Sequence, residues 1–420
     1  MEHAKLLQDN LSNQTTLLSK VTAALLGIST LISWSAILNS FDFFIYKYPK
    51  QTFHDVTFLF PIPLRFATFI WGLAMGQIYK KFSIKINIGL SLFIQSLLII
   101  LLPITAQFMQ NKYGIAACMV LCFIIGTFNC VSQNSSIAFI SQFDKSNQGI
   151  FWIFTSLSGL SMNIARAAIL AIFGKNEDGI TKRTLACFII ACFTIYATIF
   201  CLLKFLKSEK SIHSISTSNS ETFVKSNLDR GSLENGEIVI IEFTENGEIQ
   251  QKPSLINCFK IVKYIAFFLF INYIISFMLF PGVSIYQKTY SFIDSVAWQS
   301  LIMQILFNVG DLIGKIVSSF HFYNSFLLYT LTILRGIFFF TFLMSARDPN
   351  NSFFGNDYFA MIDIFLFALT HGFITSSLMQ IGAKRSSKQE EKNIISLILA
   401  FFFTLGLSVG TFLALVLEQH

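Results

Sequence analysis

Long apolar runs alternate with short polar segments along most of the chain. Eleven of these runs are long enough to cross about 30 Å of hydrocarbon as helices. They cover 20–45, 57–79, 86–107, 114–140, 149–173, 184–206, 258–280, 295–320, 325–344, 358–381 and 393–416. The pattern therefore predicts an all-α polytopic membrane protein with eleven transmembrane helices.

One long hydrophilic stretch, 207–256, divides the predicted spans into six and five and is rich in Ser, Asn and Glu. Such a composition is typical of a flexible linker. We expect five parts along the chain: a cytosolic tail at 1–19, an N-terminal bundle at 20–206, a cytosolic linker at 207–256, a C-terminal bundle at 257–417 and an extracellular C-terminus at 418–420. Two bundles joined in this way are the layout of carriers that rock around a site at the bilayer midplane.

The eighth span carries a stripe of polar residues at steps of three and four, which places them on one face of a helix. They are Ser300, Gln304, Asn308, Asp311, Lys315 and Ser318. An ionised side chain at the bilayer centre costs roughly 2.5–3.5 kcal/mol. Asp311 and Lys315 are spaced i, i+4 and can offset each other. The stripe is predicted to face a bundle interior or a water-filled path through the membrane.

Shorter polar faces occur on three other spans. Span 4 carries Asn129, Gln133 and Ser136, while span 1 has a cluster that ends at Trp34 and span 5 has a run of serines up to Arg166. Most of these residues fit hydrogen bonding between packed helices. Gln133 stays open between packing and binding, because its amide both donates and accepts.

Charged residues form only 13% of the 420 residues and hydrophobic residues form 54%, which separates this chain from soluble proteins. The formal charge of +7 does not indicate a nucleic-acid partner, because the basic residues are scattered over short loops. More of them lie on the side of the N-terminus. The positive-inside rule then predicts a cytosolic N-terminus and an extracellular C-terminus.

Several charges inside spans have no role that the sequence assigns. Arg65, Arg166, Arg335 and Asp363 lie within spans, and Asp42 lies near the end of span 1. Each needs a partner, which can be purely structural. For Arg335 and Asp363 we favour helix tying, whereas Arg65 and Arg166 stay open. The seven cysteines lie in or beside spans and are interpreted as free thiols in packed interiors.

Signatures of catalysis are missing from the sequence. The six histidines show no metal-type pairing, and neither a nucleophile elbow, a phosphate loop nor a dinucleotide fingerprint occurs. We therefore expect no enzyme activity, no metal and no cofactor. A non-transporting membrane enzyme or assembly subunit, using the polar stripe for packing, is the alternative from another class.

Segment 307–315, Phe-Asn-Val-Gly-Asp-Leu-Ile-Gly-Lys, resembles the span 8 signature of equilibrative nucleoside transporters. The run 27–34 is similar to the span 1 motif of that family, and 126–133 is similar to its span 4 motif. Phe280-Pro281-Gly282 after span 7 and the residues around His371 and 382–385 follow in the family order. The resemblance covers nearly the whole chain.

This resemblance implies a major-facilitator-like carrier with a 6+5 two-bundle architecture. It implies a central substrate site lined by Trp34, Gln133, Asn308, Asp311, Lys315 and Leu31. Asp311 would accept hydrogen bonds from the ribose or base, Gln133 would read base edges, and Trp34 would supply an apolar or stacking wall. The implied substrate is a nucleoside or nucleobase, carried by a monomer in the lipid bilayer, most simply the plasma membrane.

The chain also departs from the family pattern. Lys315 replaces an arginine and so loses the planar fork of a guanidinium, His371 replaces an asparagine, and Phe340 replaces a proline. These differences indicate a divergent member. Facilitative transport by alternating access is the leading interpretation, and proton-coupled uptake through Asp311, Asp42 or Asp363 is the alternative within transport.

Overall fold

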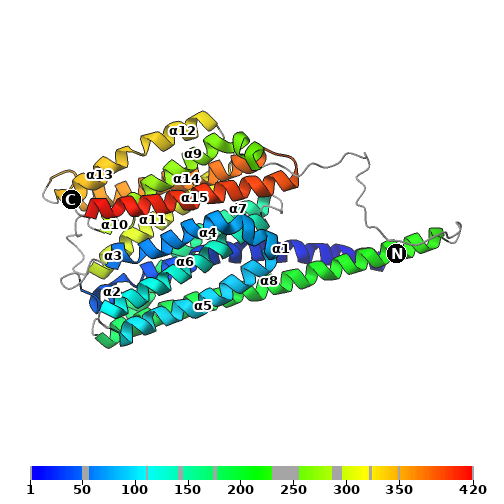
Figure 1. The fold of residues 1–420 in the computed structure, drawn as a ribbon, viewed down its shortest axis with the longest axis horizontal. Coiled ribbons are helices and arrows are strands. Elements are labelled where there is room, and N and C mark those ends of the chain that lie inside the picture. Colours follow the sequence, from blue (N-terminus) through cyan, green and yellow to red (C-terminus); the bar gives the residue numbers. More distant parts are fainter. Residues whose placement is uncertain are drawn as a thin grey trace.

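Every regular element that the structure describes is a helix. The computed structural model describes residues 2–49, 56–109, 112–140, 145–173, 177–228, 255–285, 296–320, 324–348 and 351–418. Its helices form two bundles that lie side by side, one from each half of the chain (Figure 1). The predicted all-α, two-bundle architecture is therefore confirmed.

The helices of the first half of the chain form the N-terminal bundle (Figure 1). It contains α1 (Glu2–Leu38), α2 (Phe41–Lys47), α3 (Val56–Leu59), α4 (Pro61–Lys81), α5 (Ile84–Phe108), α6 (Lys112–Ile140), α7 (Lys145–Ile172) and α8 (Glu177–Leu228). Helix α1 packs against α7 and α8, and α6 packs against α4 and α5.

The C-terminal bundle pairs its helices in the same manner. It contains α9 (Leu255–Leu279), α10 (Gly282–Ile285), α11 (Val296–Ser318), α12 (Ser325–Leu334), α13 (Ile337–Arg347), α14 (Asp357–Lys384) and α15 (Gln389–Glu418). Helix α11 packs against α14, and α9 packs against α15. The two bundles meet where α7 contacts α11 and where α4 contacts α15.

Ten helices in the described ranges are long and apolar enough to cross a membrane. Each of them overlaps one predicted span. The remaining predicted span, 57–79, overlaps α4, which is 21 residues long. Multi-pass membrane architecture is thus confirmed, with eleven as an approximate count of the spans.

Three predicted spans are interrupted helices. The first is divided into α1 and α2 around Asn39 and Ser40, and the second is divided at Phe60, between α3 and α4. Pro281, which cannot continue the hydrogen-bond ladder, separates α9 from α10 just beyond the predicted end of the seventh span. The ninth is divided at Arg335 and Gly336, between α12 and α13. Breaks of this kind are tolerated at membrane depth where neighbouring groups satisfy the freed backbone atoms.

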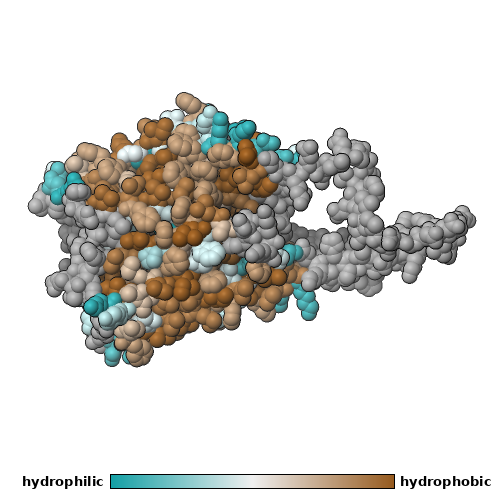
Figure 2. Space-filling view, viewed as in Figure 1, coloured by the Kyte–Doolittle hydropathy of each residue, from teal (hydrophilic) through white to brown (hydrophobic). Residues whose placement is uncertain are grey.

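The outer surface is apolar, as expected for a protein that is solvated by lipid. Figure 2 shows apolar residues over the middle of the visible face and hydrophilic residues near both ends of the helices. On α8, Ile189, Phe193 and Leu203 point outward, and Phe193 is 78% exposed. Such a row would be unfavourable in water but is favourable against hydrocarbon chains.

The predicted linker at 207–256 is only partly described. Helix α8 continues to Leu228, beyond the start of that segment. Residues 229–254 lie outside the described residues. The division of the chain into tail, bundles and linker therefore stays a prediction.

Candidate functional site

A cavity of about 90 Å³ lies between the two bundles. The N-terminal bundle lines it with residues of α1, α4, α6 and α7, and the C-terminal bundle lines it with residues of α9, α11, α14 and α15. All six residues predicted to bind substrate line this cavity: Leu31, Trp34, Gln133, Asn308, Asp311 and Lys315. They come from three helices that are far apart in the sequence.

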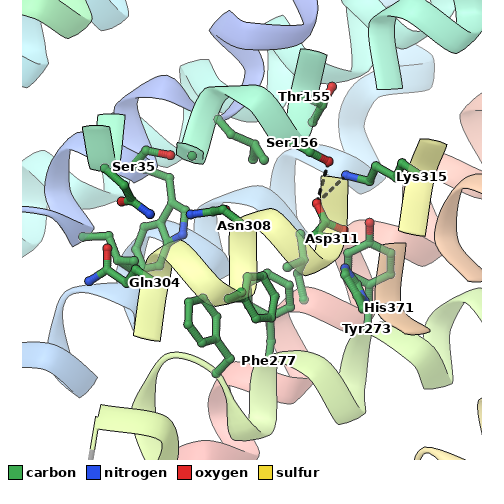
Figure 3. Close-up of a pocket in the computed structure, with 18 of the residues that line it drawn as sticks. Ser35, Thr155, Ser156, Tyr273, Phe277, Gln304, Asn308, Asp311, Lys315 and His371 are labelled. Carbon is green, nitrogen blue, oxygen red and sulfur yellow. Dashed lines mark hydrogen bonds and ion pairs between the residues drawn. The ribbon is translucent and has the colours of Figure 1, made fainter. Parts of the chain in front are cut away.

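Asp311 is the polar centre of the cavity wall. Its Oδ2 accepts a hydrogen bond from Lys315 Nζ at 2.9 Å and another from Ser156 Oγ at 2.6 Å (Figure 3). Both charged residues are buried, with 6% of Asp311 and 5% of Lys315 exposed. Lys315 offsets the carboxylate from one turn away on α11, while Ser156 belongs to α7. The carboxylate therefore also ties the two bundles together.

Two glycines allow α11 and α14 to approach closely at this point. A Cβ on Gly314 would overlap the backbone carbonyl of Leu369, and a Cβ on Gly372 would overlap the backbone carbonyl of Asp311. Small residues at helix contacts permit such approach in membrane proteins. The α11–α14 contact therefore sets the position of Asp311 in the cavity.

Amide side chains form the polar rim of the cavity beside Asp311. Asn308 fits over Gly159 of α7, where any added Cβ would overlap its side chain. Gln304 Nε2 donates to Ser300 Oγ at 3.3 Å, one turn earlier on α11. Gln133 is buried and forms no hydrogen bond within the described part of the chain. Its amide is therefore available to a ligand.

Aromatic side chains and the guanidinium of Arg65 line another side of the cavity. The Arg65 guanidinium carbon lies 4.7 Å from the centroid of the Trp34 ring and 5.3 Å from that of Phe277. Tyr273, one turn before Phe277 on α9, also lines the cavity. Trp34 and the Arg65 guanidinium that packs on its ring therefore both line this side of the cavity.

His371 joins the cavity to a buried network behind it. Its Nδ1 lies 2.8 Å from Ser276 Oγ and 3.2 Å from Asn272 Nδ2. The ring of Tyr273 packs edge-on against the imidazole, with centroids 4.9 Å apart. Asn272 and Ser276 also accept hydrogen bonds from Arg335. His371, which stands where the family has an asparagine, is therefore part of a larger hydrogen-bond network.

The hydrogen bonds of Arg335 connect neighbouring helices. Nη1 donates to the backbone and side-chain carbonyls of Asn272 and to Ser276 Oγ, Nη2 donates to the Phe367 carbonyl, and Nε donates to Thr370 Oγ1. It is 1% exposed. These bonds tie the break between α12 and α13 to α9 and α14.

The other charges within spans lie away from the cavity. Arg166 of α7 forms an ion pair with Asp42 of α2. Asp363 accepts a hydrogen bond from Thr341 Oγ1 at 3.1 Å. Neither Arg166 nor Asp363 is among the residues that line the cavity. Their contacts favour ties between neighbouring helices.

Polar residues on spans 1 and 4 divide between packing and the cavity. Ser29 and Thr30 donate to backbone carbonyls one turn earlier, and Asn129 Nδ2 donates to the Thr30 carbonyl at 2.9 Å. These contacts agree with the packing interpretation. Gln133, one turn after Asn129, lines the cavity instead.

The sequence reasoning missed several residues that line the cavity, among them Ser156, Tyr273 and Phe277. Ser156 belongs to the run of serines on span 5, but the sequence does not indicate that span 5 packs against span 8, where Asp311 lies. Tyr273 and Phe277 are one turn apart in span 7, yet aromatic residues are frequent throughout this chain. Only the arrangement of the helices identifies these residues.

Comparison with known proteins supports a single family. A family model described as "Nucleoside transporter" matches residues 118–419. Equilibrative nucleotide transporter 3 of Arabidopsis thaliana is 24% identical over 409 residues, covering 93% of this chain and 92% of that protein. Equilibrative nucleoside transporter 2 of Homo sapiens is 24% identical over 325 residues, covering 68% of this chain and 71% of that protein.

Solved structures share the fold at low sequence identity. The proton:xylose symporter XylE, of the major facilitator superfamily, aligns with a TM-score of 0.65 at 10% identity, covering 97% of this chain and 90% of the symporter. A mutant of the nucleoside transporter NupG aligns with a TM-score of 0.57 at 13% identity, covering 96% and 92%. The family model matches most of the chain, and the chain therefore belongs to the nucleoside transporter family and is a membrane transporter, not an enzyme.

Proposed function

We propose that this protein carries nucleosides across a membrane by facilitated diffusion, with the substrate bound in the cavity between the two bundles. The observation that carries the proposal is the buried Asp311–Lys315 pair in that cavity. An ion pair at membrane depth is expensive and marks a substrate pathway by default. Family membership supplies the substrate class.

The cavity offers each kind of contact that a nucleoside needs. The Asp311 carboxylate and the Gln133 amide provide acceptors and donors for ribose hydroxyls and base edges. Trp34 and Leu31 provide an apolar wall for a base. Lys315 supplies a point charge and Asn308 an amide, both on the same face of α11 as Asp311.

Transport by alternating access needs contacts that can separate. Ser156 Oγ donates to Asp311 Oδ2 across the α7–α11 contact, and Ser408 Oγ donates to the Arg65 carbonyl at 2.8 Å across the α4–α15 contact. Each is a small polar contact between the bundles. In our proposal they open and reform as the bundles rock around the cavity.

We further propose that the protein is a monomer in the plasma membrane, with a cytosolic N-terminus and an extracellular C-terminus. The distribution of Lys and Arg between the two sides supports this orientation. The segment 207–256 would then be a cytosolic linker between the bundles.

Radiolabelled uptake is the direct test of this function. The protein is expressed in cells that lack nucleoside uptake, and purine and pyrimidine nucleosides and free bases are supplied at two pH values. We expect saturable nucleoside uptake above vector-only cells, together with mutual competition between nucleosides. Expression at the membrane without any nucleoside or base flux would refute the proposal.

Proton-coupled uptake is the second candidate. Asp311 Oδ1 is buried and has no hydrogen-bond partner among the described residues. An Asp311 carboxylate oxygen that no described residue binds is where a proton would be carried in this second mechanism. Uptake that rises with an inward proton gradient would favour this candidate over facilitated diffusion.

A further inference from the structure

Arg65 occupies a position between two cavities. It lines the central cavity and also a second cavity of about 20 Å³, and Trp34 and Phe277 line both as well. The residue lies near the start of α4 and is 3% exposed. A buried guanidinium therefore forms part of the wall that a bound substrate would contact.

The Arg65 guanidinium donates no hydrogen bond to any residue that the structure describes. The contacts recorded for the guanidinium are with the faces of the Trp34 and Phe277 rings. Its Nε is buried without a hydrogen-bond partner, and Arg65 forms no ion pair with the residues that the structure describes. Arg335 and Arg166, in contrast, bind carbonyls and a carboxylate. A buried donor without an acceptor costs free energy unless a ligand supplies the acceptor.

The charges around the cavity also favour a ligand that supplies hydrogen-bond acceptors. Lys315 is paired with Asp311, so these two charges offset each other. Arg65 is then an additional positive charge on the cavity wall. A guanidinium carries five N–H donors and no acceptor. Its complement is a group with acceptors only, and two adjacent acceptors in one plane suit the fork best.

We propose that Arg65 determines base specificity by donating hydrogen bonds to the acceptor edge of a 6-oxopurine nucleoside, an inference that rests on the proposed function. A 6-oxopurine presents O6 and N7 on one edge, the pair that arginine binds in bidentate fashion. A 6-aminopurine presents an amino group there, so two donors would face each other. A base that packs against Trp34 would lie beside the Arg65 guanidinium, because the guanidinium packs on the same ring.

Two other roles for Arg65 give different results. If it only closes the wall between the cavities, its replacement changes the transport of all nucleosides by the same factor. If it binds a phosphate group, a nucleoside monophosphate competes with nucleosides for the cavity. Base specificity alone changes the ratio of transport efficiencies between an oxo and an amino purine.

The experiment measures initial rates of inosine and adenosine uptake by the full chain in cells without their own nucleoside transport. We expect an inosine preference of about tenfold in Vmax/KM, the discrimination of one bidentate pair. Arg65→Gln should bring the ratio near one, and Arg65→Lys, which keeps the charge without the fork, should give an intermediate ratio. Arg347→Gln makes the same change at an exposed position of α13 and should keep the wild-type ratio.

Measurements on the wild-type protein give a test that does not depend on the variants. 7-Deazainosine lacks the N7 acceptor and should lose most of the preference, whereas inosine monophosphate should not compete. An unchanged ratio in Arg65→Gln, full transport of 7-deazainosine, or competition by the monophosphate would each overturn the proposal. Wild-type protein that carries nucleosides without an inosine preference would refute only this inference, whereas the lack of any nucleoside flux would refute the proposed function too.

Discussion

At the residue scale, the Asp311 carboxylate accepts hydrogen bonds from Lys315 and Ser156, and Asp311 also lines the cavity. Asp311→Asn keeps the size of the side chain but removes its charge. Lys315 is then a buried cation without a counter-charge, and the cavity loses its carboxylate. Because hydrogen bonds to charged groups contribute about 1.5–3 kcal/mol, we expect nucleoside uptake to fall at least about tenfold at unchanged surface expression.

Ser156→Ala is the matched control for this prediction. It removes one hydrogen bond from the same carboxylate but leaves the ion pair in place. Uptake should fall by a smaller factor than in Asp311→Asn. Undiminished flux in Asp311→Asn, measured at equal surface expression, would show that the cavity is not the substrate site.

Arg335 should matter for stability more than for substrate choice. Its guanidinium binds groups of α9 and α14, and it does not line the cavity. Arg335→Met leaves the Asn272 side chain and the Phe367 carbonyl without these donors, at a cost of roughly 1–3 kcal/mol for each unsatisfied group. We expect a lower melting temperature in detergent and poor surface expression.

The exposed residue Arg347 provides the comparison. Arg347→Met should melt close to the wild type, because a single exposed side chain contributes little. If Arg335→Met were as stable as wild type and changed only substrate selectivity, the structural role of Arg335 would be wrong.

Individual residues differ in how far the sequence could place them. Asp311 and Lys315 were paired from their spacing alone, because both lie on one helix face. The contacts of Arg65 with Trp34 and Phe277, and of Arg335 with Asn272, join spans whose proximity is set by the packing of the bundles. Spacing within one helix carries no information about such contacts.

At the element scale, the contact between α11 and α14 positions the site. Gly372 leaves room for the Asp311 backbone, and replacement by valine would force the two helices apart. Overpacking typically costs about 1–3 kcal/mol, and here the obstructing atom is the Asp311 carbonyl oxygen, which is backbone. Gly372→Val should therefore reduce both thermal stability and uptake, measured on purified protein and in cells.

Gly89 of α5 is a control with open space around it, since a Cβ there would meet nothing within 4 Å. Gly89→Ala should keep full uptake and gain up to about 1 kcal/mol from helix propensity. Wild-type behaviour of Gly372→Val would mean that α11 and α14 do not need this close approach.

The apolar runs predicted the helices well because each must be long enough to cross hydrocarbon. They did not predict the interruption at Arg335 and Gly336, where α12 ends and α13 begins. Gly336 lies at the break, but an isolated glycine is tolerated inside helices and is only a weak signal. The break is instead held by the hydrogen bonds that Arg335 donates to α9 and α14, which the local sequence does not reveal.

At the scale of the whole molecule, the cavity depends on both halves of the chain. Its wall combines Trp34 and Gln133 of the N-terminal bundle with Asp311 and Lys315 of the C-terminal bundle. A relative rotation of the bundles therefore changes every contact with a bound substrate. This arrangement suits a carrier that exposes one site to each side in turn.

Facilitated diffusion makes a thermodynamic prediction for the intact protein. A uniporter only equilibrates its substrate, so an unmetabolised nucleoside analogue should stop accumulating when its concentrations inside and outside are equal. An imposed pH gradient should leave that endpoint unchanged. Coupling to one proton would instead let a tenfold proton gradient support roughly tenfold accumulation of a neutral substrate, because both correspond to about 1.4 kcal/mol.

The endpoint is measured in proteoliposomes with a pH jump, and Asp311→Asn, in which uptake should be much slower, serves as the low-activity control. Among the aspartates available to carry a proton, Asp311 lines the cavity, whereas Asp42 is held by Arg166 and Asp363 accepts from Thr341. A coupled mechanism would therefore have to use the same carboxylate that Lys315 neutralises, and protonation would break that ion pair. We expect equal concentrations on both sides at every pH gradient; accumulation that a protonophore abolishes would overturn facilitated diffusion while leaving the fold and the cavity unchanged.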